Sequence, residues 1–311
     1  MNNAANPDRP LLGIMLMLAF CVMAPFGDAL GKILGASLPI LMIVAVRFLA
    51  QAVLLGPIAL ASGARPQLTS RHWRIIVQRT VLHICGIALM FTALRYLPLA
   101  DAIAIAFVMP FIMLLLGWAV LGEAVGPHRL AACGVGFVGT LLVIQPSFAA
   151  VGWAALLPLG VAVVFALFML QTRQIAKSVD AVTLQAISGC IAMAILAPIY
   201  LVGGALGWDI AALPRPTGNE AWLLLLTGIV GSIAHLFMTW SLRFAPSATL
   251  APMQYLEIPF ATVIGFVIFR DLPNGLAAIG ILVTISAGLY VIWRERVATA
   301  RPTPVPAPPA A

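Results

Sequence analysis

Charged residues are scarce in this sequence. Only 9% of its 311 residues are Asp, Glu, Lys or Arg, whereas 62% are hydrophobic and the mean hydropathy is +1.08. Because soluble globular domains carry roughly a quarter charged residues, this composition excludes an ordinary water-soluble protein. We expect an all-α integral membrane protein that lies in the lipid bilayer.

The sequence also lacks the motifs of common hydrolases, prenyl-transferring enzymes and ATP-driven pumps. It contains no HExxH, DDxxD-like, GxSxG or Walker sequence. We therefore predict no enzyme activity, no metal site and no cofactor. Cysteine is scarce as well, and with no CxxC spacing the four residues are expected to be packed side chains: Cys21, Cys85, Cys133 and Cys190.

The net charge of +7 is that of a basic protein. In a membrane protein a basic excess is typical of loops on the cytoplasmic side, so we predict no nucleic-acid partner. With the N-terminus inside, only Lys32, Arg95, Arg215 and Arg270 fall on the opposite face. This asymmetry predicts a multi-pass protein of the inner (plasma) membrane with both termini in the cytoplasm.

Ten apolar runs approach the length of about 20 residues that a spanning helix needs. A short cytoplasmic segment, 1–10, precedes them, and the Pro/Ala-rich segment 297–311 is expected to be a disordered cytoplasmic tail. The predicted helices cover residues 11–33, 39–62, 73–94, 98–121, 127–145, 151–172, 181–204, 221–242, 248–270 and 275–293.

The two halves of the chain resemble each other at an offset of 148 residues. Residues 93–100 align with 241–248, sharing Leu, Arg, an aromatic residue, Pro and Ala, and 121–123 align with 269–271. This predicts two repeats, 11–145 and 151–293, with five helices each. Because five is odd, the second repeat would be inverted, a construction of secondary transporters that bind substrate between the repeats. The alternative is chance similarity between two Leu/Ala-rich segments.

Ionisable residues within the predicted spans are candidates for a binding site, since each costs about 2.5–3.5 kcal/mol on insertion scales. Asp28 and Lys32 share one face of the first helix, and Arg47 lies at a depth from which it can pair with Asp28. One interpretation is that the Asp28–Arg47 pair binds substrate. The other is that it is a structural ion pair that tethers the first two helices, while Lys32 extends to the lipid headgroups. Arg95 and Asp101 are expected at an outer mouth, as a gate or a solvated pair.

Arg79 and His83 share one face of the third helix and together suit a carboxylate. His83 titrates near neutral pH and is a candidate carrier of a coupled proton. The competing interpretation is a histidine that hydrogen-bonds its neighbours, and it applies equally to His235.

Glu257 is the leading candidate because it lies mid-span beside Pro259, which we expect to kink the ninth helix. A carboxylate there suits a cationic group or a proton, although it can equally brace the bundle. Pro110 predicts a matching kink in the fourth helix. The side chains expected to supply hydrogen bonds or stacking surface, if they are not plain packing, are Gln254, Tyr255, Phe107 and Trp240.

The order of these motifs over nearly the whole chain resembles the EamA branch of the drug/metabolite transporter superfamily, which are ten-span carriers built from two repeats. Arg270-Asp271 departs from the Gly-Glu common at that helix end in the family. The motifs that carry the resemblance are Asp28-Ala29-Leu30-Gly31-Lys32, Arg47-Phe48, Leu97-Pro98-Leu99-Ala100-Asp101-Ala102, Pro110 followed by Leu121-Gly122-Glu123, and Tyr255-Leu256-Glu257.

The segment 248–269, with Asp28, Lys32 and Arg47-Phe48, looks most like the S-adenosylmethionine carriers of that family. The resemblance implies uptake or exchange, by alternating access, of a small zwitterionic metabolite. Arg79 or Arg47 would face its carboxylate, Glu257 its cationic centre, and Tyr255 or Phe107 a flat ring.

Other functions stay open because fold does not fix substrate. The superfamily also exports amino acids and drugs and carries vitamins such as riboflavin, and a membrane enzyme or structural protein is the remote alternative. Coupling to protons and exchange for a counter-substrate are both compatible with the sequence, which does not specify an oligomeric state.

Overall fold

The computed structural model describes residues 9–62, 68–143, 152–270 and 275–300, and within these ranges every regular element is a helix. Two short 3₁₀ turns, η1 (Gly152–Ala155) and η2 (Asp209–Ala211), join longer elements. The α-helices are α1 (Pro10–Gly35), α2 (Ile40–Ala61), α3 (Ser70–Ala93), α4 (Leu99–Ala106), α5 (Met109–Leu121), α6 (Pro127–Val143), α8 (Leu156–Ile175), α9 (Ala181–Ala205), α10 (Gly218–Phe244), α11 (Ser247–Gln254), α12 (Glu257–Phe269) and α13 (Gly275–Ala300).

Eight segments of the described chain are long and apolar enough to cross a bilayer. They coincide with the predicted spans one to four and six to nine. The fifth and tenth stay predictions, since α6 has 17 residues and the apolar part of α13, Ala278–Tyr290, is short. Helix α13 also continues to Ala300, past the predicted start of the tail, because no proline interrupts it before Pro302. Residues 1–8 and 301–311 lie outside the described residues.

The fourth and ninth spans are interrupted rather than merely kinked. Short links, Phe107–Val108 and Tyr255–Leu256, separate α4 from α5 and α11 from α12. The duplicated kinks expected at Pro110 and Pro259, which suit interrupted helices around a central site, are thus found as breaks in both spans. Pro110 and Pro259 lie in the first turns of α5 and α12, where an amide has no carbonyl of its own helix to bond.

The helix boundaries repeat along the chain. From α3 onwards, each helix begins 148 residues before its counterpart, so that α3 pairs with α10, α4 with α11, α5 with α12 and α6 with α13. Helices α2 and α9 begin 141 residues apart. We call two residues counterparts when one of these offsets relates them. The offset is 141 between residues of α1–α2 and residues of α8–α9, and 148 between residues of α3–α6 and residues of α10–α13.

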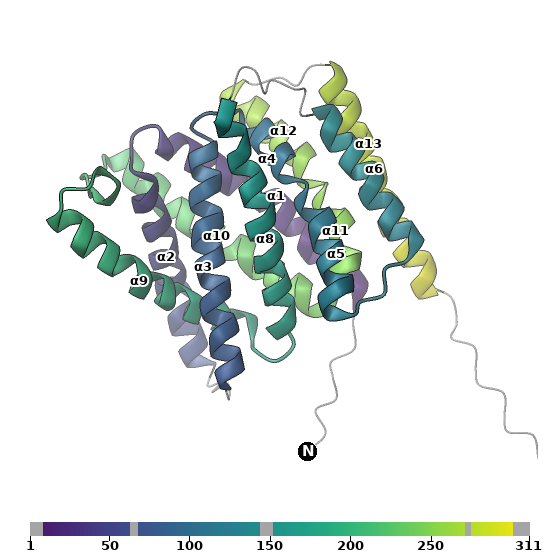
Figure 1. The fold of residues 1–311 in the computed structure, drawn as a ribbon, viewed down its shortest axis with the longest axis horizontal. Coiled ribbons are helices and arrows are strands. Elements are labelled where there is room, and N and C mark those ends of the chain that lie inside the picture. The colour runs from purple at the N-terminus through teal and green to yellow at the C-terminus, as the bar shows by residue number, and fades with distance from the viewer. Residues whose placement is uncertain (1–8, 63–67, 144–151, 271–274, 301–311) are drawn as a thin grey trace, which may run out of the picture.

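Counterpart helices pack reciprocally. Helix α1 packs chiefly against α10, and its counterpart α8 packs chiefly against α3. Helices α2 and α9 contact each other at one edge of the bundle, and α6 and α13 contact each other at the opposite edge (Figure 1). The interrupted helices therefore lie between two edges that are each made by a counterpart pair.

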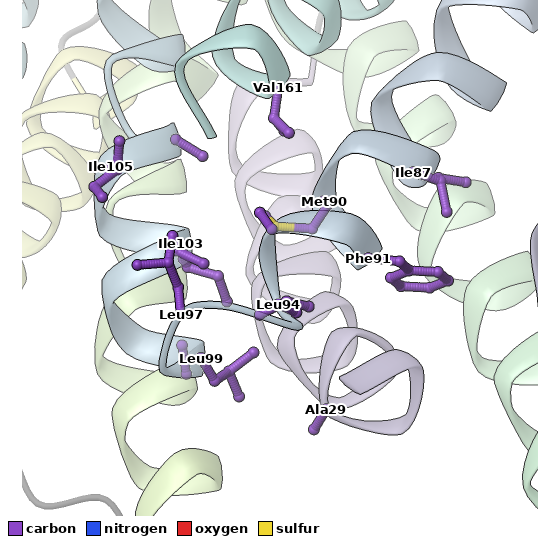
Figure 2. Close-up of a cluster of buried hydrophobic side chains, with 14 of the residues drawn as sticks. Ala29, Ile87, Met90, Phe91, Leu94, Leu97, Leu99, Ile103, Ile105 and Val161 are labelled. Carbon is purple, nitrogen blue, oxygen red and sulfur yellow. The ribbon is translucent and has the colours of Figure 1, made fainter. Parts of the chain in front are cut away.

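The largest apolar cluster lies around the interrupted span of the first half. Figure 2 shows Met90 of α3 and Leu94, directly after α3, beside Leu99 and Ile103 of α4, with Val161 of α8 close by. These side chains are at most 8% exposed. The cluster packs α3 and α4 against α1 and α8, which fixes the walls of the central cavity described below.

The ends of α5 and α12 generate a stability prediction. Gly122 and Arg270, which are counterparts, both end their helices with a left-handed backbone, at φ 64° and 62°. The departure from the family's Gly-Glu pattern thus leaves this helix end unchanged, but a residue with a Cβ is strained there by about 1–2 kcal/mol.

We therefore expect Arg270→Gly to raise the free energy of unfolding by about 1 kcal/mol, since glycine adopts this conformation without that strain. Thermal denaturation in detergent measures the change, and Gly122→Ala is the matched variant that should lower the melting temperature. A lower melting temperature for Arg270→Gly would contradict the assignment of strain.

Candidate functional site

A central cavity lies where the interrupted helices meet α1, α2, α3, α8 and α10. Its volume is about 60 Å³, which is room for a few water molecules. Four ionisable or titratable side chains and an aromatic wall surround it. The lining residues are Phe20, Met23, Ala24, Gly27, Asp28, Arg47, Ile87, Met90, Ala106, Phe107, Met109, Val161, Phe165, Gly231, Ala234, His235 and Glu257.

Arg47 forms the polar contact between α2 and α10 in this wall. Its Nη2 lies 3.0 Å from Nδ1 of His235. Because arginine only donates, Nδ1 accepts in this contact. The same nitrogen lies 3.1 Å from the carbonyl oxygen of Gly231, and Nε2 of His235 has no partner among the described residues. Asp28, the partner anticipated for Arg47, lines the same cavity and attracts Arg47 electrostatically, although no direct ion pair between the two is found among the described contacts.

A glycine makes room for the Arg47 side chain. A Cβ on Gly231 of α10 would lie 2.6 Å from Cζ of Arg47, closer than real Cβ contacts. A Cβ on Gly27 of α1, which lines the same cavity, would meet Val230 at an ordinary 3.6 Å. The guanidinium therefore packs directly on the backbone of α10.

The two carboxyl groups of the cavity come from different halves of the chain. Asp28 lies in the last third of α1, and Glu257 is the first residue of α12, directly after the interruption. Neither accepts a hydrogen bond from another described residue, and Phe107 lines the cavity at the matching interruption between α4 and α5. Asp28, Arg47, Phe107 and Glu257 are thus the predicted binding residues that the structure brings together.

The other predicted pair, Arg79 and His83, is fully buried outside the cavity wall. Arg79 donates from Nε to Thr172 and from Nη1 to Ser188, at 3.1 and 2.7 Å, and its guanidinium lies 4.7 Å from the Phe168 ring. The rings of His83 and His235 are 4.2 Å apart. His83 therefore packs directly against a ring that lines the cavity.

The remaining predicted binding residues also lie away from the cavity wall. Gln254 is buried with its amide nitrogen against the sulfur atoms of Met113 and Met169. Tyr255 is buried on Gly136 with its ring 5.7 Å from that of Phe107. Trp240 is half-buried, and its ring is tilted against that of Phe237 at a centroid distance of 6.3 Å.

The predicted mouth residues surround a second, wider pocket of about 830 Å³ at one end of the bundle. Lys32, one turn beyond Asp28 on α1, lines it and donates to the carbonyl of Leu97 at 3.1 Å. Arg95 also lines it, but donates to the carbonyl of Leu38 at 2.7 Å. Asp101 lies half-buried in the first turn of α4.

An ion pair at the other end of the bundle was not among the predicted site residues. Arg173 of α8 pairs with Glu123 at 3.0 Å, and Glu123 also accepts a hydrogen bond from the amide of Ala248 in α11. The pair joins the end of α5 to α8 and α11. No signal in the sequence indicated it, because each residue by itself reads as an ordinary charged helix end.

Comparison with known proteins identifies the family. The model of the EamA-like transporter family matches residues 11–145 and 152–294. The chain belongs to the EamA-like transporter family. Family and relatives together describe a multi-pass membrane transporter rather than an enzyme.

Two relatives and one solved structure illustrate what this EamA-type chain is similar to. A riboflavin transporter of Rhizobium johnstonii is 31% identical over 75% of this chain and 74% of its own length. An S-adenosylmethionine uptake transporter of Rickettsia prowazekii is 23% identical over 92% of this chain and 94% of its own. A crystal structure with 19% identity shares the fold, with a TM-score of 0.69 over 92% of this chain and 98% of that one.

The Arg47–Gly231 contact predicts a sharp difference between two glycine substitutions. Gly231→Ala displaces the guanidinium from His235, and we expect uptake of the transported substrate to fall at least about tenfold, the equivalent of one charge-assisted hydrogen bond. Gly27→Ala should retain more than about half of the uptake, since its Cβ makes an ordinary contact.

Transport assays in proteoliposomes measure both variants, with thermal denaturation in detergent as the control for folding. Equal activity of two folded variants would show that the position of Arg47 does not matter for transport.

Proposed function

We propose that this protein is a secondary carrier for a small polar metabolite that bears a cationic group and a flat ring, such as S-adenosylmethionine. One observation carries the proposal: the central cavity combines two carboxyl groups, a single guanidinium and aromatic walls. The aromatic walls come from Phe20, Phe107 and Phe165 and offer stacking surface to a ring.

The charges of the cavity support selection of a cation. With Asp28 and Glu257 ionised, one guanidinium leaves the wall with a formal charge of −1. A sulfonium or ammonium group restores neutrality in a region where an unpaired charge is costly. The carboxylate of a zwitterion would then face Arg47, rather than the enclosed Arg79.

The repeated helix boundaries support two inverted five-helix repeats, 11–145 and 151–293, in a ten-helix carrier. The offsets, the reciprocal packing of α1–α10 and α8–α3, and the two interrupted spans are what such a construction requires. The inner membrane and cytoplasmic termini, inferred from the distribution of basic residues, belong to the same proposal.

Alternating access follows from the size of the cavity and from the contacts at its two ends. Pockets for drug-sized ligands are roughly 300–1,000 Å³, so a cavity of about 60 Å³ must widen to admit substrate. The Arg173–Glu123 pair closes one end, and Lys32 lies between the cavity and the wide pocket at the other. Breaking one set of contacts while keeping the other would expose the site to one side at a time.

A second candidate substrate is a flavin. The 31% identity to a riboflavin transporter favours it, and the three phenylalanines suit a tricyclic ring. Riboflavin is neutral, so it would bind by stacking and hydrogen bonds without engaging the two carboxyl groups as counter-ions.

Uptake by proteoliposomes tests the proposal with S-adenosylmethionine, riboflavin and aromatic amino acids as substrates. We expect saturable uptake of S-adenosylmethionine and a loss of at least about tenfold in Glu257→Gln, because a neutral amide no longer balances the cation. Asp180→Asn is the matched control: it removes an acid outside the cavity, and asparagine caps α9 equally well.

The pattern of results separates the candidates. Uptake of riboflavin that is indifferent to Glu257→Gln would identify a flavin carrier, and no saturable flux of any substrate would refute the carrier function. An imposed pH gradient and a preloaded counter-substrate, applied separately, distinguish proton coupling from exchange.

A further inference from the structure

The central cavity is only partly symmetric with respect to the repeated halves. Eight of its lining residues form four counterpart pairs, so these positions surround the axis that relates the halves. The pairs are Phe20 with Val161, Ala24 with Phe165, Ile87 with His235, and Met109 with Glu257.

The rest of the lining has counterparts that do not reach the cavity. Arg47 corresponds to Ser188, Gly231 to His83, and Asp28 to Met169. Ala106 and Phe107 correspond to Gln254 and Tyr255. All five of these counterparts have an exposed fraction of 0%: Ser188, His83, Met169, Gln254 and Tyr255.

Polar atoms without a hydrogen-bond partner are frequent among these buried counterparts. Of ten such side-chain atoms in the described residues, four belong to three of these counterparts: both ring nitrogens of His83, Oε1 of Gln254 and the hydroxyl of Tyr255. A fifth, Nη2 of Arg79, belongs to the residue that bonds Ser188. Arg79 is held by Ser188, the counterpart of Arg47. Buried polar groups in proteins are normally hydrogen-bonded, so the unpaired atoms of these residues need a physical explanation.

We infer that Arg79, His83, Gln254 and Tyr255 form a second substrate-binding wall, which faces the cavity when the carrier opens to the opposite side of the membrane. This inference rests on the proposed carrier function with inverted repeats. In such a carrier the two halves exchange their conformations, and residues packed away in one state occupy the lining positions of the other.

The chemistry of the second wall defines what it binds. It presents a guanidinium, an imidazole, an amide and a phenol, and no carboxyl group lies among them. This set suits the anionic group of the substrate, a carboxylate or a phosphate. The anionic group would therefore pass from Arg47 to Arg79 across the adjacent rings of His235 and His83.

Glu257 keeps its place in both states, because its counterpart Met109 also lines the cavity. Asp28 and Arg47 leave the wall as Arg79 enters it. The opposite-facing site thus keeps a single guanidinium but loses a carboxyl group, which weakens its hold on the cationic group of the substrate.

The competing explanation is that Arg79 only braces α3 against α8 and α9 through Thr172 and Ser188. The two explanations differ in whether water ever reaches Ser188. A brace stays dry in every functional state, whereas a binding wall becomes accessible from one side of the membrane.

Single cysteines in a cysteine-free parent test the inference, with the four native cysteines replaced by alanine. Ala106→Cys reports the present cavity, and Ser188→Cys reports the second wall. Met169→Cys, at the counterpart of Asp28, is the second reporter if Ser188→Cys does not fold. A membrane-impermeant thiol reagent is applied to right-side-out and to inverted vesicles.

We expect modification of Ala106→Cys from one side of the membrane and of both second-wall reporters from the other, each at least about tenfold faster than from the wrong side. Modification of all three from the same side, or of neither second-wall reporter in folded protein, would overturn the inference. Uptake by the parent is measured in the same vesicles, so that a failure of the carrier function itself shows separately as an absence of flux.

Discussion

The guanidinium of Arg47 packed on the backbone of α10 is the contact on which the central cavity depends. A cation inside a bilayer protein is stable only when its donors are used and its surroundings are polar. Gly231 makes room for it, His235 accepts its hydrogen, and the two carboxyl groups of the same wall supply opposite charge at longer range. These requirements keep a small space with charged and polar groups in its wall between helices that otherwise pack through apolar side chains.

The repeated helix arrangement positions the cavity, and differences between counterpart side chains determine which chemical groups line it. The helix boundaries of the halves repeat at one offset for α3 to α6, yet Ile87 corresponds to His235 and Met109 to Glu257 in the lining of the cavity. The first half therefore contributes apolar surface at positions where the second contributes a titratable group. A binding site for one kind of molecule arises because the two halves keep their backbone in common while their side chains differ.

The candidate site was predictable in part because lipid makes polar residues conspicuous. Asp28, Arg47 and Glu257 stand out in apolar runs, and all three line the cavity. Phe107 was singled out only as one aromatic residue among several, and Phe20 and Phe165 were not singled out at all, since aromatic residues in spans usually pack against neighbours. Arg79 and His83 were equally conspicuous in sequence, but the face they share turns towards α8 and α9.

The sequence by itself determined that the chain lies in a membrane, where eight of its helices run, and that proline disturbs the fourth and ninth spans, because length, hydropathy and proline act locally. Only the tertiary structure decided that Arg47 bonds His235 rather than Asp28, and that Glu123 meets Arg173. Helical periodicity fixes the depth and the face of a side chain. Its partner depends on how helices far apart in the chain cross, and packing of the whole bundle settles that.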